Sequence, residues 1–349
     1  MKTKFSGTKS AMAMTSVVIL LLHAWALLAL YYWFGGLGWM AAVVIVGYLA
    51  GIGLLFRIAE RKSHAAGTSL MLVAAVAVWW SLRSPDPDLD LAYTRETEQL
   101  AELEFEGNQL RVEGMRNFRY PAPDDVDARW ASRTYDLSQL RAVDFIFTYG
   151  SAGGYSPGIM LSFDFNESPP LAVAIAPRLE KGETFNQTAA FFKQYELCYL
   201  WGDEQDFVKE STTLRGEEVF LHRSSLTPDQ GRRLLREMAA RTHEIHDEQP
   251  RYYSPLFTRP GFVFAAHVES LTGGSFPWAA LMGTVRSCEN RWLENGLLLP
   301  APSRDSARIN GRVQEGSTSL SFSDRIRSHL PAREDSSAPW DQQPFGNPQ

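Results

Sequence analysis

Three long apolar runs occupy the front of the chain. Each is about 16 to 24 residues long, and about 20 residues suffice for a helix to cross a bilayer. The runs cover residues 11–34, 38–56 and 67–82. Trp79 and Trp80 near the end of the third run suit the aromatic belt at a membrane–water interface. The pattern predicts a membrane region over residues 1–83 with three transmembrane helices. A cleaved signal peptide is the competing interpretation of the first run, but that run is long for a signal core and two more follow it.

Basic residues near the apolar runs predict their orientation. They precede the first run and fill the loop between the second and third: Lys2, Lys4, Lys9, Arg57, Arg61 and Lys62. Such residues remain preferentially in the cytoplasm, so the amino terminus and the loop at 57–64 are expected there. Three crossings then place the remainder outside the cytoplasmic (inner) membrane of a bacterium, in the periplasm of a diderm cell. His23 is the one group in the runs that would titrate near neutral pH, and we expect a polar contact between helices.

After the apolar runs, the pattern changes to short strands and amphipathic helices. An acidic, Pro-containing linker covers residues 84–104, and the following domain spans 105–330. Strands are predicted at 143–149, 158–165, 171–176, 196–201 and 218–222, and helices at 185–195, 227–246, 262–271 and 278–293. The predicted helix over 227–246 begins with a capping box, formed by Thr227 and Gln230, with Pro228 at its first helical position. The chain from Pro300 should be mostly mobile, ending in a disordered tail at 331–349. The predicted fold class is α+β.

Aromatic, Arg and Asp residues alternate densely between Met115 and Leu137. The stretch reads as a strand over 110–120, an Asp-rich turn, and a second segment that carries Trp130 and Tyr135. One interpretation is a solvated face on which Arg and Asp side chains pair, each pair contributing little. The other is the opening of a recognisable domain, because several longer blocks follow.

These blocks resemble the Lnb N-terminal periplasmic domain family. The resemblance rests on RNFRY, DxDxRW and RTYDLSQL near the start, and then on RLEKGETF, FFKQYEL, GDEQD and RGEEVFLHR, in the family's order and at similar spacing. SFSDRIR at 321–327 resembles a short block near the end of family members. The likeness covers roughly residues 105–330 and a similar membrane-anchored front end.

The resemblance implies a papain-like (NlpC-like) core of the lipoprotein N-acyltransferase lineage. In that chemistry a Cys thiolate activated by His carries an acyl group, which comes from a phospholipid or from the lipoprotein itself. Here the nucleophile position falls at Pro260, the His position at Gly158, and a third, acidic position at Ala176. We therefore expect a catalytically inactive relative that binds a lipid, a lipoprotein or an active partner enzyme at the membrane surface. The cleft candidates are Arg119, Arg129, Trp130, Tyr135, Arg178 and Tyr253.

Two other classes of function stay open. The first is a working thiol- or hydroxyl-dependent acyltransferase or hydrolase whose catalytic residues lie elsewhere, and the second is a purely structural envelope protein. Cys198 lies in an alternating strand and Cys288 within a helix, where a buried, inert thiol is the usual case, and a bridge between them is undecided. A Cys or Ser in the cleft with a His within about 3.5 Å would favour the enzyme.

The sequence contains no pattern that predicts binding of a metal, a cofactor or nucleic acid. His243 and His246 are three residues apart, whereas the zinc motif on a helix needs a spacing of four and a third ligand. A solvated helix end explains that pair better. The formal net charge is −6 and no dense basic stripe lies outside the membrane flanks, which argues against nucleic acid.

Overall fold

The structure is a computed structural model, and it divides the chain into two compact units. It describes residues 4–34, 38–59, 61–85, 91–122, 125–150, 155–273, 283–314 and 320–330. Unit 1 comprises Met1–Pro85 and Thr188–Gln194, and unit 2 comprises Asp86–Gln187 and Tyr195–Gln349. Most of the Pro-containing part of the expected linker, and the expected tail at 331–349, lie outside the described residues.

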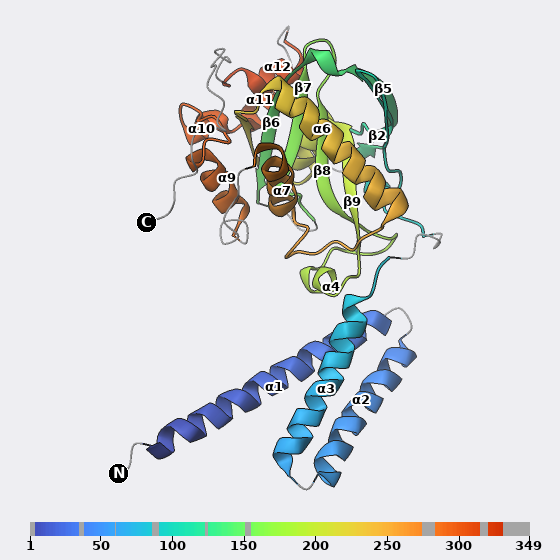
Figure 1. Ribbon diagram of the computed structural model, residues 1–349. Helices are drawn as coiled ribbons and strands as arrows, with labels where there is room; N and C mark the ends of the chain where they lie inside the picture. The colour runs from blue at the N-terminus through green and yellow to red at the C-terminus, as the bar shows by residue number, and fades with distance from the viewer. Residues whose placement is uncertain are drawn as a thin grey trace. The chain divides into compact units, whose positions relative to one another are not determined.

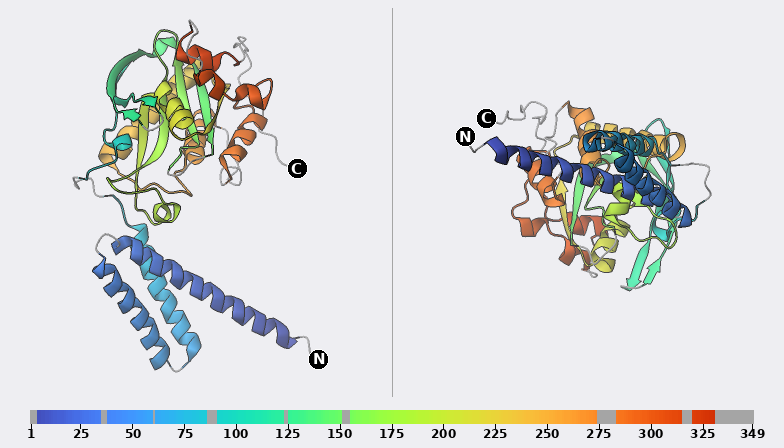
Figure 2. Two further views of the ribbon diagram at one scale, coloured as in Figure 1. Left: turned by 180° about the vertical axis from the view of Figure 1, so that it is seen from behind. Right: turned by 90° about the horizontal axis from the view of Figure 1, so that it is seen from below.

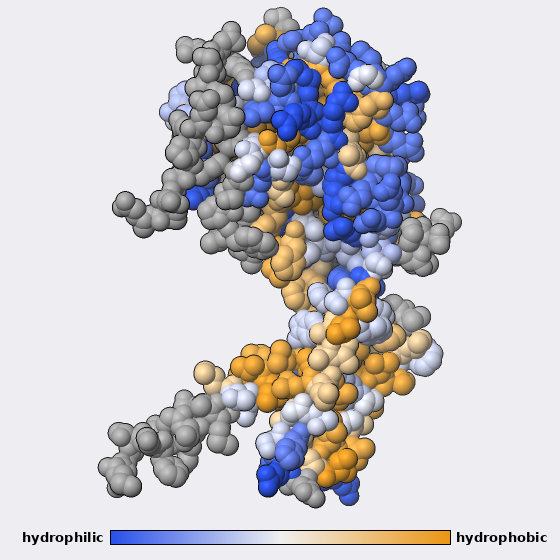
Figure 3. All heavy atoms as spheres, viewed as in Figure 1, coloured by the Kyte–Doolittle hydropathy of each residue, from blue (hydrophilic) through white to orange (hydrophobic). Residues whose placement is uncertain are grey.

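Unit 1 contains the three predicted apolar helices. They are α1 (Lys4–Phe34), α2 (Trp39–Ile58) and α3 (Lys62–Ser81), and each is long and apolar enough to cross a membrane. α3 begins at Lys62, five residues before the predicted start at residue 67. The helix therefore extends into the polar residues that precede its apolar run. Their surface is mainly hydrophobic, whereas the visible face of unit 2 is mainly hydrophilic (Figure 3). A helix that exposes apolar side chains all round suits lipid as its solvent.

A polar contact joins the three helices. His23 Nδ1 on α1 lies 2.8 Å from the Tyr48 hydroxyl on α2, and its Nε2 lies 3.1 Å from Ser69 Oγ on α3. His23 and Ser69 are both buried. Such contacts between membrane helices are worth about 0.6 to 2 kcal/mol, so the expected role of His23 as a polar link between helices agrees with its surroundings.

Unit 1 also includes the short segment Thr188–Gln194. The Lys193 ammonium donates to the carbonyl oxygens of Trp80, Ser81 and Arg83 at 3.0, 3.1 and 3.0 Å. The Trp80 carbonyl also accepts from the Arg83 backbone N–H at 3.3 Å. A cation is favoured at the carboxyl end of a helix, where carbonyls lack intrahelical donors. The neighbouring Phe192 stacks on the Tyr32 ring at 5.2 Å. The predicted helix over 185–195 is present but shorter: α4 covers Gln187–Phe191, and Lys193 beyond its end takes a left-handed backbone conformation with φ 59°.

Unit 2 is built on one large mixed sheet (Figure 1). Its strands are β1 (Glu102–Glu106), β2 (Gln109–Arg116), β5 (Trp130–Asp136), β6 (Leu140–Tyr149), β7 (Ile159–Phe165), β8 (Leu171–Arg178), β9 (Glu196–Asp203) and β10 (Glu218–Arg223). The order is β1-β2-β9-β8-β7-β6-β10, with β5 paired to β2. All pairs are antiparallel except β2 with β9. A separate hairpin joins β3 (Arg119–Ala122) to β4 (Asp125–Asp127), so the predicted strand over 110–120 is in fact two.

Helices cover both faces of this sheet (Figures 1 and 2). One face carries α6 (Pro228–His243), α7 (Pro260–Thr272) and α9 (Val285–Glu294), with Trp292 of α9 packed edge-on against Phe145 and Phe147 of β6. The other face carries α5 (Glu204–Lys209), α11 (Asn310–Gln314) and α12 (Phe322–Arg327), with α10 (Arg304–Ala307) beside β10. Shorter turns lie at 95–97, 137–139, 210–214 and 244–248. The α+β class is confirmed.

Two helix starts differ from their predictions and one agrees. Thr227 forms the predicted capping box with Gln230. α7 begins two residues early because Pro260 occupies its first turn, where a missing N–H costs nothing. α9 begins at Val285, capped by the Thr284 side chain; the predicted start at Trp278 lies outside the described residues.

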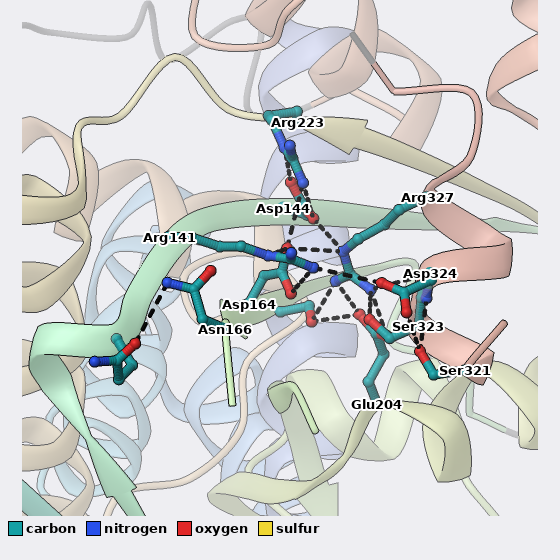
Figure 4. A network of polar contacts seen from close by, with 12 residues as sticks. Arg141, Asp144, Asp164, Asn166, Glu204, Arg223, Ser321, Ser323, Asp324 and Arg327 are labelled. Carbon is teal, nitrogen blue, oxygen red and sulfur yellow. Dashed lines mark hydrogen bonds and ion pairs between the residues drawn. The ribbon is translucent and has the colours of Figure 1, made fainter. Parts of the chain in front are cut away.

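The prediction of mobility from Pro300 onward is wrong for α10, α11 and α12. Arg327 of α12 is buried among carboxylates of the sheet face, which makes α12 part of the core (Figure 4). Its guanidinium contacts Asp144 at 2.8 Å and Glu204 at 2.7 Å. Three Arg and three acidic side chains share this network: Arg141, Arg223, Arg327, Asp144, Asp164 and Glu204. Matched charges allow the network to be buried.

Candidate functional site

A cavity of about 330 Å³ lies where the start of β7 meets the start of α7. Gly158 and Pro260, the two positions that the family resemblance assigns to the base and the nucleophile, both line it. Its other walls are Tyr155, Ser156, Pro157, Ile159, Phe185, Gln187, Tyr253, Pro255, Arg259, Gly261, Val285 and Cys288. The fold therefore brings these two positions together in one hollow beside a helix amino terminus. Ala176, the third position, lines a different cavity.

The backbone at Gly158 suits glycine and excludes a larger residue. Its φ is +72°, and a Cβ atom built there would lie 2.6 Å from Val285 Cγ2. Real carbon atoms do not approach so closely, so a His at this position would collide with α9 as well as strain the backbone. Val285 thus occupies the space that a side chain at position 158 would need.

The amino terminus of α7 carries no nucleophile. Pro260 is buried in the first turn, and the Arg259 guanidinium at the N-cap position donates to the Gly283 carbonyl. A helix amino terminus can lower the pKa of a thiol, but a proline ring has no group to ionise. Position 260 therefore presents no ionisable group to the amino terminus of α7.

Cys288 supplies a thiol to the same cavity. A Cβ atom at Gly261 would lie 3.0 Å from Cys288 Sγ, so α9 places this sulfur against the first turn of α7. Burial raises the pKa of Cys288, and the charge of Arg259 opposes that rise. The thiol therefore stays protonated at neutral pH. Sequence reasoning missed this position, because only the packing of α9 on α7 brings residue 288 to residue 261.

The histidines of unit 2 make their hydrogen bonds to groups other than a nucleophile. His222 bonds Glu289 at 2.9 Å, and His267 bonds Glu237 at 2.9 Å and the Tyr199 hydroxyl at 3.1 Å. His246 accepts from the Tyr199 backbone N–H, and His329 contacts the Leu221 carbonyl. The exposed His243 pairs with Asp247 at 2.7 Å. His243 and His246 thus have different partners, and no group able to hold a metal ion occurs among the described residues.

A second cavity of about 340 Å³ opens on the other face of the sheet. Its walls are mainly apolar and include Met160, Ala174, Ala176, Leu200, Phe207 and Leu214. Its charged groups neutralise one another: Glu210 lies 2.5 Å from both Arg116 and Arg215. Neighbouring strand residues point to opposite faces, which is why Ile159 lines the first cavity and Met160 the second.

The predicted cleft residues are dispersed over unit 2. Tyr253 lines the first cavity and packs edge-on against Tyr155. Tyr135 is fully buried and packs on Phe165, so it supports the sheet. Trp130 packs edge-on against Phe118.

The three predicted arginines also lie apart. Arg129 is 61% exposed and pairs with Asp127. Arg178 covers the Tyr93 ring at 3.5 Å and lines a further cavity. Arg119 lies on β3 and lines yet another. Only Tyr253 therefore shares a cavity with Gly158 and Pro260.

Cys198 is enclosed in the sheet. Burial raises its pKa to about 12, so it is an inert core thiol at neutral pH. Cys198 and Cys288 are not joined by a disulfide in this structure.

Comparison with known families identifies a domain within this chain. The model of the Lnb N-terminal periplasmic domain matches residues 127–256. The match includes Gly158 and Ala176 and ends before Pro260. Together with the three apolar helices it fits a membrane protein with a periplasmic domain. Comparisons with curated proteins and with solved structures give no match.

Proposed function

We propose that this protein is a membrane-anchored periplasmic binding protein, a catalytically inactive relative of the lipoprotein N-acyltransferases with a papain-like core. The amino terminus and the loop at 57–64 lie in the cytoplasm, and unit 2 lies on the outer side of the inner membrane. The observation that carries the proposal is the cavity between β7 and α7. It offers glycine and proline at the two key positions, and Val285 occupies the space of a base.

The ligand of this binding protein is the acyl chain of a lipid or lipoprotein, held in the second cavity. The mainly apolar walls and the volume of about 340 Å³ support this assignment, because ligand pockets of about 300 to 1,000 Å³ with apolar linings are typical. Glu210 is already neutralised by Arg116 and Arg215, so an apolar ligand leaves no buried charge uncompensated.

The acylation state of lipoproteins in cells can be measured to test whether this protein is catalytically inactive. Mass spectrometry of lipoprotein amino termini should give the same acylation state with and without the protein. An acylation state that depends on the protein and is lost in Cys288→Ala would contradict the proposal. Cys198→Ala is the matched control, since its thiol is enclosed in the sheet.

Binding of a fluorescent fatty acid to the full chain in non-ionic detergent tests the cavity. Ala176→Leu fills the second cavity from β8. Excluding two CH₂ groups of the ligand, at about 0.8 kcal/mol each, should weaken binding about tenfold. Ala131→Leu on β5 adds the same volume to a half-buried strand position and should leave affinity unchanged. Equal affinity in both variants would remove the second cavity from the proposal.

One observation favours a second candidate, an acyltransferase or hydrolase that uses Cys288. The thiol lies against the first turn of α7, in the cavity that the family resemblance marks as the site. Activity would require a thiolate, and burial raises the pKa of this thiol. A covalent adduct on Cys288 after incubation with a reactive acyl ester near neutral pH would favour the enzyme.

A further inference from the structure

Three cations from separate elements of unit 2 come together without a carboxylate partner among the described residues. They are Arg119 on β3, Lys209 at the end of α5 and Arg325 on α12, and all three are half-buried. β3 and α12 both pack against α5, the helix that ends at Lys209. Burial, and beside it the positive charges of Arg119 and Arg325, lower the pKa of Lys209. The charges are therefore close enough to repel one another.

Between described residues, Arg119 and Arg325 make few hydrogen bonds. Arg119 donates to the Phe118 carbonyl at 3.4 Å, and Arg325 Nη1 donates to the Leu320 carbonyl at 3.0 Å. Arg325 Nε is buried and has no hydrogen-bond partner within the part of the chain that the structure describes. A buried donor without an acceptor destabilises the folded protein, and a ligand that accepts from it removes that penalty.

The carboxylates on the same elements are engaged elsewhere. Asp206 on α5 lies 2.6 Å from Arg116, and Asp324 on α12 accepts from Ser321 Oγ at 2.6 Å. Asp324 also lies 3.7 Å from Arg141. The chain has a net charge of −6, so a shortage of acidic residues does not explain the unneutralised cluster.

We propose that Arg119, Lys209 and Arg325 form a binding site for a phosphate group. Two guanidinium groups offer planar forks that match phosphate oxygens, and the ammonium adds a point charge. A phosphate carries up to two negative charges and several acceptor oxygens, enough for three cations and the orphan Nε donor. The group can belong to a free phosphate or to the headgroup of a phospholipid, which have this chemistry in common. The site is separate from both cavities of the proposed function.

Thermal unfolding of the full chain in non-ionic detergent measures this binding. Inorganic phosphate should raise the Tm more than sodium chloride at equal ionic strength. Lys209→Gln should weaken the apparent phosphate affinity at least about tenfold, and Lys209→Arg should largely retain it. Lys181→Gln is the matched control, because Lys181 is 63% exposed and distant in sequence from the cluster.

The Tm of Lys209→Gln in the absence of phosphate is an independent test of the cluster. Removing one of three mutually repelling charges should raise the Tm of Lys209→Gln at low salt, and added salt should narrow the difference. Competition by short-chain phosphatidylglycerol would assign the site to a headgroup, and binding of inorganic phosphate alone would assign it to a free phosphate. The proposal is overturned if phosphate stabilises no more than chloride, or if Lys181→Gln and Lys209→Gln lose affinity equally.

Discussion

The buried ion network that holds α12 to the sheet permits a quantitative test. Arg327 is the central cation: its Nε lies 2.8 Å from Asp144, its Nη1 lies 2.7 Å from Glu204, and its Nη2 lies 3.1 Å from Ser162 Oγ. Its side chain is 5% exposed. Arg327→Met keeps the length and the apolar stem of the side chain but removes the charge, so three acidic groups remain with two arginines.

Removing one partner of a buried ion pair costs about 3 to 5 kcal/mol, because the remaining charge loses its compensation in a medium that solvates it poorly. For a domain of about 150 to 250 residues, each kcal/mol lowers the Tm by roughly 2 to 4 °C. Arg327→Met should therefore lower the Tm of unit 2 by roughly 6 to 20 °C. The matched control is Arg129→Met, whose side chain is 61% exposed beside Asp127 and whose loss should leave the Tm unchanged.

The pH dependence separates charge from packing. Burial raises the pKa of Glu204, and Arg327 opposes that rise. Without Arg327 the pKa rises further, so the folded state takes up a proton more readily than the unfolded state. Stability then increases as the pH falls from the raised pKa toward the ordinary value, and the Tm deficit should shrink between about pH 7 and about pH 5.

The assay is thermal unfolding of the full chain in detergent, followed by near-ultraviolet circular dichroism. A Tm loss below about 2 °C would refute the inference that this network secures α12. An equal loss at both pH values would show that lost packing, rather than an uncompensated carboxylate, causes the effect. Arg327→Met combined with Glu204→Gln should recover part of the loss at neutral pH, because it restores the charge balance.

Three further outcomes are expected. Gly158→Ala should cost about 1 to 3 kcal/mol more in chemical denaturation than Gly107→Ala, because both have a positive φ but only residue 158 faces Val285. The imidazole of His246, whose pKa burial lowers to about 4, should titrate near that value by NMR; the unfolded chain takes up the proton first, so stability falls as the pH drops from about 6.5 through 4. Lys193→Ala should speed proteinase K cleavage around 188–194 while Lys181→Ala does not, since only Lys193 holds carbonyls at the end of α3.

Local patterns were sufficient to predict several elements of this fold. The three apolar helices follow from composition alone, and the start of α6 follows from Thr227 and Gln230, which interact within one turn. β6, β7 and β8 are buried along nearly their whole length because helices cover both faces of the sheet, and their sequences are correspondingly rich in apolar residues. In each case the determining interactions are close in sequence or general to the environment.

Distant partners explain what the sequence did not predict. The segment after Pro300 has the composition of a mobile tail, yet Arg327 is ordered by Asp144 and Glu204, which lie 183 and 123 positions earlier. α4 ends at Phe191, and the Lys193 ammonium just beyond it bonds the carbonyls of Trp80 and Arg83, more than 100 positions earlier in the chain. No periodicity or propensity encodes such pairings.

Part of the candidate site was predictable and part was not. The family resemblance assigned Gly158 and Pro260 to one site, and both line one cavity in the structure. This was predictable because each position is defined by motifs close to it in sequence. Cys288 was assigned to a helix interior, which is correct, but its cavity depends on how α9 packs on α7. The proximity of Val285 to position 158 likewise depends on the packing of α9 and could not be predicted from the sequence.

That contact gives the inactive interpretation a consequence that sequence comparison does not provide. If only the identity of the side chains at positions 158 and 260 mattered, Pro260→Cys with Gly158→His would create a thiol–imidazole pair. The packing argues otherwise, because a Cβ atom at 158 would lie 2.6 Å from Val285 Cγ2. In a Cys198→Ala, Cys288→Ala background, Pro260→Cys alone should show a modestly lowered thiol pKa from the helix terminus. Adding Gly158→His should lower it no further, whereas adding Val285→Ala as well should. Alkylation rates measured against pH report this pKa, and full depression without Val285→Ala would contradict the argument.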